Sequence, residues 1–247
     1  MIMSEKLFIP DLCTGNVVLL YPSRRIVKAK RIMVDIGFSR VKGNSDDVDI
    51  VDYINYVVFL SHQHNADVMA IIPDSWDYNK HVMNLIRFRK VIKQRIERGG
   101  DDVKRIRWLI VVHYGNVNAF VNQYIAYYQG LKSIIPLGFA IPLRKMTVYT
   151  TKPGVIACSR RPSACDTIAR YIIKKIGSVD DDAYIHGLGI RKKLLPLLNL
   201  LNSADTASYR LAINDELRTK DYGKGTYMIS SKDSPCDWFS AWLGDYA

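Results

Sequence analysis

Short apolar runs alternate with amphipathic segments along most of this chain, and that alternation constrains the fold more than any other feature. The runs are rich in β-branched residues and bounded by turn-forming residues, as buried strands are. Strands separated by helices pair in parallel through right-handed crossovers. The predicted strands are 15–22, 31–37, 67–74, 106–115, 133–141, 183–190 and 203–213, with a weaker eighth run at 146–151.

Helical periodicity fills most of the intervals between these runs. Seven strands and a weaker eighth favour an α/β fold of the (β/α)8, TIM-like barrel type over an open doubly wound sheet. Neither G-x-G-x-x-G nor G-x4-G-K-[ST] occurs, which disfavours a Rossmann domain. We expect one compact domain over 1–247, with 210–247 as a C-terminal extension packed on it. The predicted helices are 47–64, 79–98, 118–131, 164–176 and 191–202, the last interrupted by Pro196.

Hydropathy and cysteine usage predict a cytoplasmic protein. Mean hydropathy is −0.05, no apolar run approaches the ~18 residues of a membrane span, and the first residues do not resemble a signal peptide. The cysteines lack the C-x2-C spacing of zinc sites, so we expect reduced thiols, no metal and no cofactor. The cysteines are Cys13, Cys158, Cys165 and Cys236, of which Cys158 and Cys165 are close enough in sequence to pair.

The net charge of +11 favours a polyanionic partner. Clustered Lys and Arg bind nucleic acid through phosphate contacts and counterion release. A generally basic surface that serves solubility is the alternative. The basic helix 79–98 is open to the same two interpretations, a solvated outer face or a phosphate-contacting surface.

Three predicted strands end on an acid, at Asp35, Asp74 and Asp205. The carboxyl ends of barrel strands carry the catalytic groups of such folds. Carboxylates gathered there can bind a divalent metal, act at a glycosidic carbon, or accept hydrogen bonds from a base. The structural alternative is that each acid caps the helix that follows it.

Other polar or flexible positions fall at predicted strand ends too. His113 and His186 are candidates for substrate contact, or for hydrogen bonds within the rim of the barrel. Gly37 and Gly138 would let a ligand approach the backbone. Trp76, two residues after Asp74, could flank a flat ligand or pack beneath its loop.

The order of these motifs resembles the tRNA-guanine transglycosylases and their DNA-modifying relatives, which exchange guanine for a 7-deazaguanine. "MVDIGFS" is similar to the family's first acidic motif, with Asp35 and Gly37, and "DVMAIIPD" to its second, with Asp74. "PLGFAI", with Gly138, is similar to the Gly-Gly-Leu strand end that receives the base edge. "IHGLGI" is similar to the late Gly-Val-Gly strand, and "SADTASY" places Asp205 where the family has its nucleophile.

The resemblance implies a role for each matched residue. Asp205 would attack the anomeric carbon and form a covalent glycosyl intermediate. Asp35 would orient the base or transfer a proton, and Asp74 would accept hydrogen bonds from the amine and ring N–H of the base. Gly37, Gly138, His113 and His186 would contact substrate. Phosphates of the flipped-out nucleotide would be held by Arg24, Arg25, Lys28, Lys30, Arg31, Lys192 and Lys193.

Departures from the family pattern bear on the substrate. Ile36 replaces a serine, the second glycine of that motif is missing, and Ala204 replaces the Phe before the nucleophile. The C-x-C-x2-C…His zinc site of the tRNA enzymes is absent, which favours DNA slightly over tRNA. A non-catalytic nucleic-acid-binding barrel is the main alternative, and a metal-dependent hydrolase using the three acids is another. A homodimer is left open.

Overall fold

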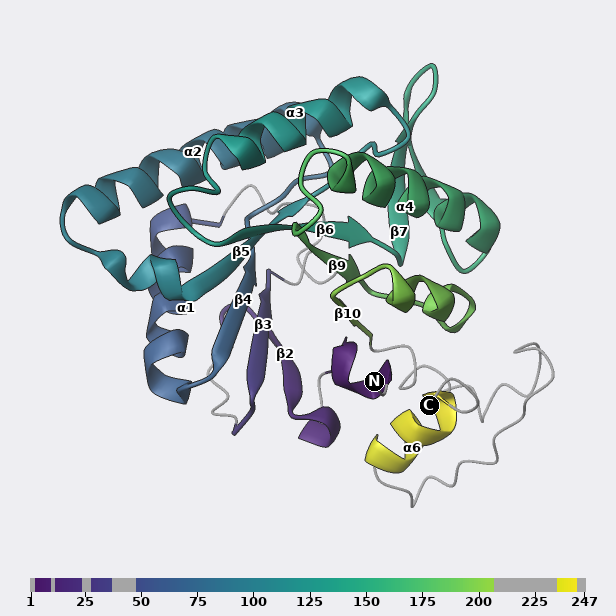
Figure 1. Cartoon of the computed structure of the whole chain (residues 1–247), viewed down its shortest axis with the longest axis horizontal. Coiled ribbons are helices and arrows are strands. Elements are labelled where there is room, and N and C mark those ends of the chain that lie inside the picture. The colour runs from purple at the N-terminus through teal and green to yellow at the C-terminus, as the bar shows by residue number, and fades with distance from the viewer. Residues whose placement is uncertain (1–2, 10–11, 24–27, 37–47, 207–234, 244–247) are drawn as a thin grey trace.

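A computed structural model describes residues 3–9, 12–23, 28–36, 48–206 and 235–243 (Figure 1). The described residues form an eight-stranded parallel sheet in the order β1-β10-β9-β6-β5-β4-β3-β2. Its strands are β1 (Leu7–Phe8), β2 (Asn16–Leu20), β3 (Arg31–Asp35), β4 (Asp67–Ile71), β5 (Ile106–Val111), β6 (Leu137–Pro142), β9 (Tyr184–Leu188) and β10 (Ser203–Asp205).

The sheet curls into a nearly closed barrel, so the predicted TIM-like fold is confirmed. The two edge strands meet where Ile9 bridges Val17 in parallel. The closing strand is β1, however, and the prediction of 146–151 as the eighth barrel strand was wrong. Those residues overlap β7 (Lys145–Tyr149), which pairs antiparallel with β8 (Pro153–Ala157) in a separate hairpin. A two-residue strand such as β1 is too short to show any periodicity in the sequence.

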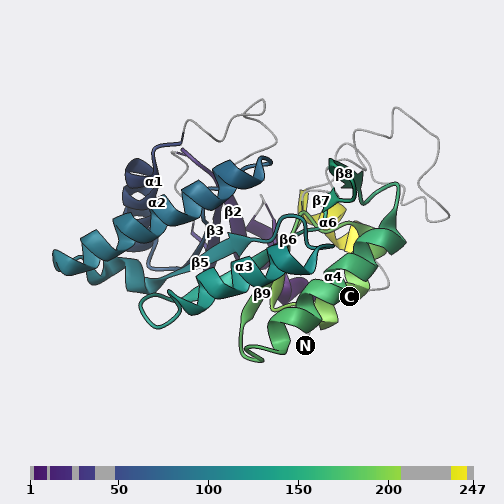
Figure 2. The same cartoon turned by 90° about the horizontal axis from the view of Figure 1, so that it is seen from above.

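Helices cover the outside of the barrel (Figures 1 and 2). Local sequence sets several of their ends: the Asp49 carboxylate caps the first helix by accepting from the N–H groups of Val51 and Asp52, and the Asp77 carboxylate caps the second. Residues 192–199 form a 3-10 helix around Pro196, which cannot donate a helical hydrogen bond. The covering elements are α1 (Ile50–His64), α2 (Tyr78–Glu97), α3 (Asn118–Gln129), α4 (Pro162–Gly177) and η5 (Lys192–Asn199).

The barrel interior is a packed core. Alternate side chains of the strands point inward and form one apolar cluster, as the period-two geometry of strands requires. At the amino-terminal end, Arg31 lies over the ring of Phe8 at 5.2 Å and Arg107 lies over the ring of Tyr184 at 4.3 Å. The cluster consists of Phe8, Met33, Met69, Ile71, Leu109, Val111 and Ala140.

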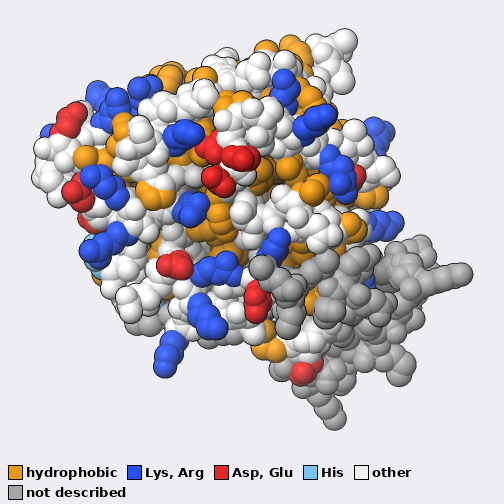
Figure 3. Space-filling model, in the orientation of Figure 1, with side chains coloured by type: hydrophobic (Ala, Val, Ile, Leu, Met, Phe, Trp, Pro, Cys, Tyr) orange, Lys and Arg blue, Asp and Glu red, His pale blue; other side chains and the backbone are white. Residues whose placement is uncertain are grey.

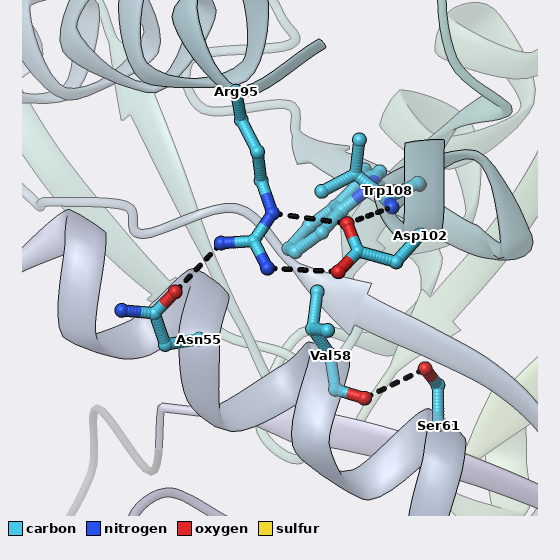
Figure 4. Close-up of polar contacts among 7 residues, drawn as sticks. Asn55, Val58, Ser61, Arg95, Asp102 and Trp108 are labelled. Carbon is cyan, nitrogen blue, oxygen red and sulfur yellow. Dashed lines mark hydrogen bonds and ion pairs between the residues drawn. The ribbon is translucent and has the colours of Figure 1, made fainter. Parts of the chain in front are cut away.

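One polar cluster ties α1 and α2 to the start of β5 (Figure 4). Arg95 donates to both carboxylate oxygens of Asp102 at 2.9 and 2.8 Å and to Asn55 Oδ1 at 2.6 Å. Asp102 Oδ1 also accepts from the Val103 N–H, and the Val103 carbonyl accepts from the buried Trp108 indole. The bond from Arg95 holds the pKa of Asp102 below its usual value. This cluster lies away from the carboxyl ends of the strands and serves the scaffold.

The C-terminal helix α6 (Pro235–Leu243) packs against η2 (Leu12–Thr14), between β1 and β2. Phe239 and Leu243 are buried, and a disulfide joins Cys13 to Cys236. The connection from β1 to β2 has no α-helix among its described residues, so α6 supplies cover close to the seam where the barrel closes.

The expectation of four reduced thiols was wrong. Besides Cys13–Cys236, a second disulfide joins Cys158 to Cys165. These two cysteines are close enough in sequence to pair, as the sequence indicated. Sequence spacing could not reveal the first pair, because its partners are separated by 223 residues and only the fold brings them together.

Among the described residues, none of the helices combines the length and the apolar composition needed to cross a membrane.

We predict that the long-range disulfide stabilises the protein more than the short one. Cross-linking lowers the entropy of the unfolded chain more when the closed loop is longer. Relative to wild type, Cys13→Ser/Cys236→Ser should therefore lose about 2–3 kcal/mol more free energy of unfolding than Cys158→Ser/Cys165→Ser. Urea unfolding of both variants measures the difference, and thiol titration of the denatured wild type should find no free thiol. Equal losses, or four titratable thiols, would contradict this assignment.

Candidate functional site

The three acids singled out in the sequence all lie at the carboxyl ends of barrel strands, an end called the mouth below. Asp205 is the last residue of β10, Asp35 is the last residue of β3, and Asp74 follows β4 by three residues. In the ring of eight strands, β10 and β4 are four strands apart in either direction. Asp205 and Asp74 therefore face each other across the mouth, and Asp35 lies on the strand next to that of Asp74.

Asp205 is held through one of its carboxylate oxygens. His186 Nε2 lies 3.2 Å from Oδ1, and the Gly189 N–H donates to the same atom at 2.8 Å. These are the hydrogen bonds that the described residues make to the carboxylate, so within this part of the chain Oδ2 accepts none. The side chain is 18% exposed. Asp205 thus presents one oriented oxygen to the mouth.

A chain of hydroxyl groups stands behind His186. Ser203 Oγ lies 2.7 Å from His186 Nδ1, and the Tyr184 hydroxyl lies 2.7 Å from Ser203 Oγ. A neutral imidazole with its proton on Nε2 satisfies every partner: Tyr184 donates to Ser203, Ser203 donates to Nδ1, and Nε2–H donates to Asp205. Ser203 is fully buried beneath the imidazole. It is therefore a positioning group and not a serine-hydrolase nucleophile, whose hydroxyl must reach substrate.

Asp74 is held in the same way on the opposite side of the mouth. His113 Nε2 donates to Asp74 Oδ2 at 2.9 Å, and His113 Nδ1 lies 3.1 Å from Thr147 Oγ1. The Thr147 oxygen also accepts from the Tyr114 N–H at 2.9 Å, so its own proton is available for Nδ1. The Asp74 side chain is 12% exposed. Each of these two acids therefore receives a hydrogen bond from a histidine that a hydroxyl orients.

Both arrangements reduce the cost of placing a carboxylate in a partly buried site. A carboxylate that loses water must recover its hydrogen bonds from the protein. The hydroxyl bonds also fix the imidazole tautomer and ring orientation, which in turn fixes the carboxylate. The site is a pair of pre-oriented carboxyl groups, which can accept hydrogen bonds or attack an electrophilic carbon.

A further histidine, His81, is buried behind His113. Their ring centroids are 5.0 Å apart, and His81 Nε2 lies 3.0 Å from the Val111 carbonyl. His81 Nδ1 finds no hydrogen-bond partner among the described residues. Burial, followed by the neighbouring His113, lowers the pKa of His81 to about 3, against an opposing contribution from Asp74. His81 is therefore neutral at ordinary pH.

Asp35 lies at the rim with a partly exposed side chain. Its carbonyl accepts from the Tyr21 N–H at 2.8 Å, which fixes the backbone where β3 ends. Beneath it, the buried Tyr53 hydroxyl donates to the Ile71 carbonyl at 2.6 Å. Burial raises the pKa of Tyr53, and the Asp35 carboxylate adds to this effect. Gly37, the other residue of this motif, lies outside the described residues.

Gly138 is not at the mouth, so its expected place at a strand end was wrong. It is the second residue of β6, which starts four residues later than the predicted strand 133–141 and ends one residue later, and it pairs with Leu109 and Tyr184. A Cβ here would lie 2.6 Å from the Tyr184 carbonyl oxygen and 2.9 Å from a Leu109 methyl group. The glycine is explained by close packing of strands.

The basic residues proposed to hold phosphates are divided between the two ends of the barrel. Lys28, Lys30 and Arg31 precede or begin β3 and therefore lie at the amino-terminal end, opposite the mouth. Lys192 and Lys193 follow β9 and begin η5, on the side of the mouth. Arg24 and Arg25 lie outside the described residues. Lys and Arg side chains are scattered over the face shown in Figure 3 and form no single patch there.

Ser203, Thr147 and Gly189 complete the site but were not identified from the sequence. Ser203 could have been found, because a residue two before Asp205 on a strand points to the same face. Thr147 could not, since it comes from a hairpin far along the chain. Gly189 has φ +68, and a Cβ would lie 2.9 Å from Arg144 Cβ, so both conformation and space require glycine.

No group of three or more His, Cys, Asp or Glu side chains in the described ranges is placed to hold a metal ion.

No protein-family model matches this chain, and no curated protein is detectably similar to it in sequence. In structure it is similar to two crystal forms of N-acetylneuraminate lyase from Mycoplasma synoviae, with TM-scores of 0.37 and 0.36 and identities of 11% and 12%. The alignments cover 77% of this chain, which spans 62% and 63% of the lyase chains. At this level the likeness says nothing about substrate or chemistry.

We predict that His81 makes stability depend on pH. Its pKa is about 3 in the folded protein and near 6.5 when unfolded, so between these values the unfolded chain binds a proton that the folded chain does not. Stability therefore falls as pH drops below 6.5, by up to about 1.4 kcal/mol per pH unit from this group.

Urea unfolding of wild type and His81→Gln between pH 4.5 and 7 checks this prediction. Glutamine can still donate to the Val111 carbonyl but does not titrate, so the stability of the variant should depend less steeply on pH. The exposed His62, changed to Gln, serves as the control and should leave the slope close to that of wild type. Parallel curves for wild type and His81→Gln would show that His81 does not carry the effect.

Proposed function

We propose that this protein is a base-exchange transglycosylase, which replaces guanine in a nucleic acid, DNA in preference to tRNA, with a 7-deazaguanine. The proposal rests on the resemblance of its motifs to the guanine transglycosylases and on the acids at the mouth. A nucleotide must leave the helical stack to reach groups placed inside such a rim. The net charge of +11 supports a polyanionic substrate.

The observation that carries the proposal is the way in which Asp205 is held. Its Oδ1 accepts from His186 and from the Gly189 N–H, and its Oδ2 accepts no hydrogen bond from the described residues. A carboxylate nucleophile needs this asymmetry, since one oxygen must be anchored while the other reaches the anomeric carbon. The two bonds also stabilise the carboxylate when it leaves in the second half of the reaction.

In the first half-reaction, Asp205 Oδ2 attacks C1′ of the nucleotide as the bond from C1′ to guanine N9 breaks. The electron pair of that bond leaves with guanine, which takes up a proton, and a covalent ester to Asp205 remains. In the second half, the incoming deazapurine loses its N9 proton and attacks C1′, and the ester bond breaks. Asp35, at the same rim, is the group that we assign to give and take these protons.

Asp74 suits recognition of the base. It faces Asp205 across the mouth, where a base attached to the attacked sugar would extend. His113 and Thr147 orient its carboxylate, which makes it a fixed acceptor for the amine and ring N–H groups of a guanine-like edge. Trp76 follows two residues later, with its ring centroid 6.1 Å from that of His113, and is placed to line the same side.

We predict that Asp205→Asn abolishes exchange while leaving the fold intact. The amide keeps the volume and an oxygen for the Gly189 N–H but is a poor nucleophile, so the rate should fall by about 1,000-fold or more. Incorporation of labelled guanine into DNA or tRNA measures this rate. Mass spectrometry of the denatured reaction should find a nucleic-acid adduct in wild type and none in the variant. Exchange at the wild-type rate by a folded Asp205→Asn protein would remove Asp205 as the nucleophile and favour a non-catalytic or different site.

We predict a different signature for Asp74→Asn. Loss of one buried acceptor costs about 1–3 kcal/mol, so the KM for the free base should rise by roughly 5- to 150-fold, with adduct formation retained. Asp166 offers a matched control, because it is a more exposed acid on α4 paired with Arg170. Asp166→Asn should leave both kinetic constants unchanged. If Asp74→Asn left KM unaltered, Asp74 would not recognise the base.

A further inference from the structure

We propose that the β7–β8 hairpin, together with the segment that leads from it into α4, grips the phosphate backbone of the nucleic acid beside the mouth. This inference rests on the proposed function, because it names the surface that delivers a nucleotide to Asp205. The hairpin is inserted in the chain between β6 and β9, which pair directly with each other in the barrel, and it lies outside the barrel sheet (Figure 2). None of the residues assigned to phosphate binding from the sequence belongs to it.

The first observation is charge. Between Arg144 and Cys165 the sequence contains five cations and no Asp or Glu, whereas the whole chain has 24 acids among 247 residues. All five side chains are exposed. A surface segment without Asp or Glu has no negative side chain to repel phosphate, and each of its cations can displace a counterion condensed on the nucleic acid. The five cations are Arg144, Lys145, Lys152, Arg160 and Arg161.

The second observation is position. Thr147, in the middle of β7, bonds to His113 and to the Tyr114 N–H, so the hairpin is attached directly to the Asp74 side of the mouth. On the other side, Arg144 packs against Gly189, whose N–H binds Asp205. The hairpin therefore begins between the two halves of the candidate active site.

The third observation is rigidity. In the described part of the chain, β7 and β8 pair only with each other, so they form a two-stranded ribbon separate from the barrel sheet. The Asn116 side chain bonds to both the N–H and the carbonyl of Tyr149, and the Cys158–Cys165 disulfide ties the end of the ribbon to α4. A ribbon held at both ends loses little entropy when it binds. A two-stranded ribbon also has the dimensions that the major groove of DNA admits.

Exposed apolar groups accompany the cations. Tyr149 is 38% exposed and Val155 is 54% exposed, both on the ribbon. The Tyr149 ring is backed by Tyr114 and Phe120, with centroids 6.2 and 5.8 Å away. A supported aromatic ring next to cations is the pattern that stacks on bases in nucleic-acid-binding proteins.

The α2 helix offers the matched comparison. Arg87 and Lys90 on α2 and Arg98 at its C-cap are exposed as well, but α2 covers the outside of the barrel (Figure 1) and none of these three bonds to a residue of the mouth among the described contacts. Neutralising three cations on either element removes the same three charges from the total of +11. The two variants therefore separate local contact from overall charge.

The test compares Lys145→Gln/Lys152→Gln/Arg160→Gln with Arg87→Gln/Lys90→Gln/Arg98→Gln, each checked for its thermal unfolding midpoint. Binding to a fluorescent 20-base-pair DNA duplex, to one of its single strands and to tRNA is measured by anisotropy from 0.05 to 0.3 M salt. For the nucleic acid that wild type binds best, the hairpin variant should bind about 100-fold more weakly at 0.1 M salt, with a log–log salt slope shallower by about 2. The α2 variant should stay within about threefold of wild type.

Equal weakening by the two variants, or wild-type affinity in the hairpin variant, would overturn the inference. Base exchange, measured in parallel, keeps this result separate from the proposed function. If wild type exchanges base but the hairpin variant binds normally, the hairpin assignment is wrong and the proposed function stands. If wild type binds through the hairpin but exchanges no base, the hairpin assignment stands and the proposed function is wrong. If wild type binds none of the three probes, both are wrong.

Discussion

The parallel hydrogen-bonded ladder of eight strands is the constraint on which the rest of this structure depends. Parallel pairing places every strand's carboxyl end at the same rim, so residues from β3, β4, β5, β9 and β10 meet although they are distant in sequence. The ladder closes through only a short β1 and the Ile9–Val17 bridge. The packing of α6 near this seam, locked by Cys13–Cys236, reinforces the weakest point of the ring.

The ring creates a problem that the side chains then solve. Acids brought to one rim repel each other and lose water, which costs free energy unless the protein replaces the lost hydrogen bonds. Asp205 and Asp74 are kept four strands apart, and each receives an N–H from a histidine fixed by a hydroxyl. The same construction on both sides of the mouth separates a group suited to attack from a group suited to recognition.

Much of the scaffold was predictable because it depends on local periodicity. The helices at α1, α2, α3 and α4 and seven of the eight barrel strands follow from apolar spacing and capping residues, and the three acids follow from their places at the ends of such strands. The errors were in features that have no local signal. β1 is two residues long, Gly138 lies near the amino end of β6 because that strand starts later than expected, and Lys30 and Arg31 face the other end of the barrel.

The sequence by itself determined the class of fold, the basic charge and the presence of Asp35, Asp74 and Asp205 at strand ends, since these follow from residue order and spacing. Only the tertiary structure decided which groups meet. Thr147 reaches His113 from a separate hairpin, Ser203 lies under His186, and Cys13 finds Cys236 across 223 residues. The reason is physical, because these contacts join elements that are far apart along the chain. Their distance in space is set only when the closed sheet fixes the position of each strand.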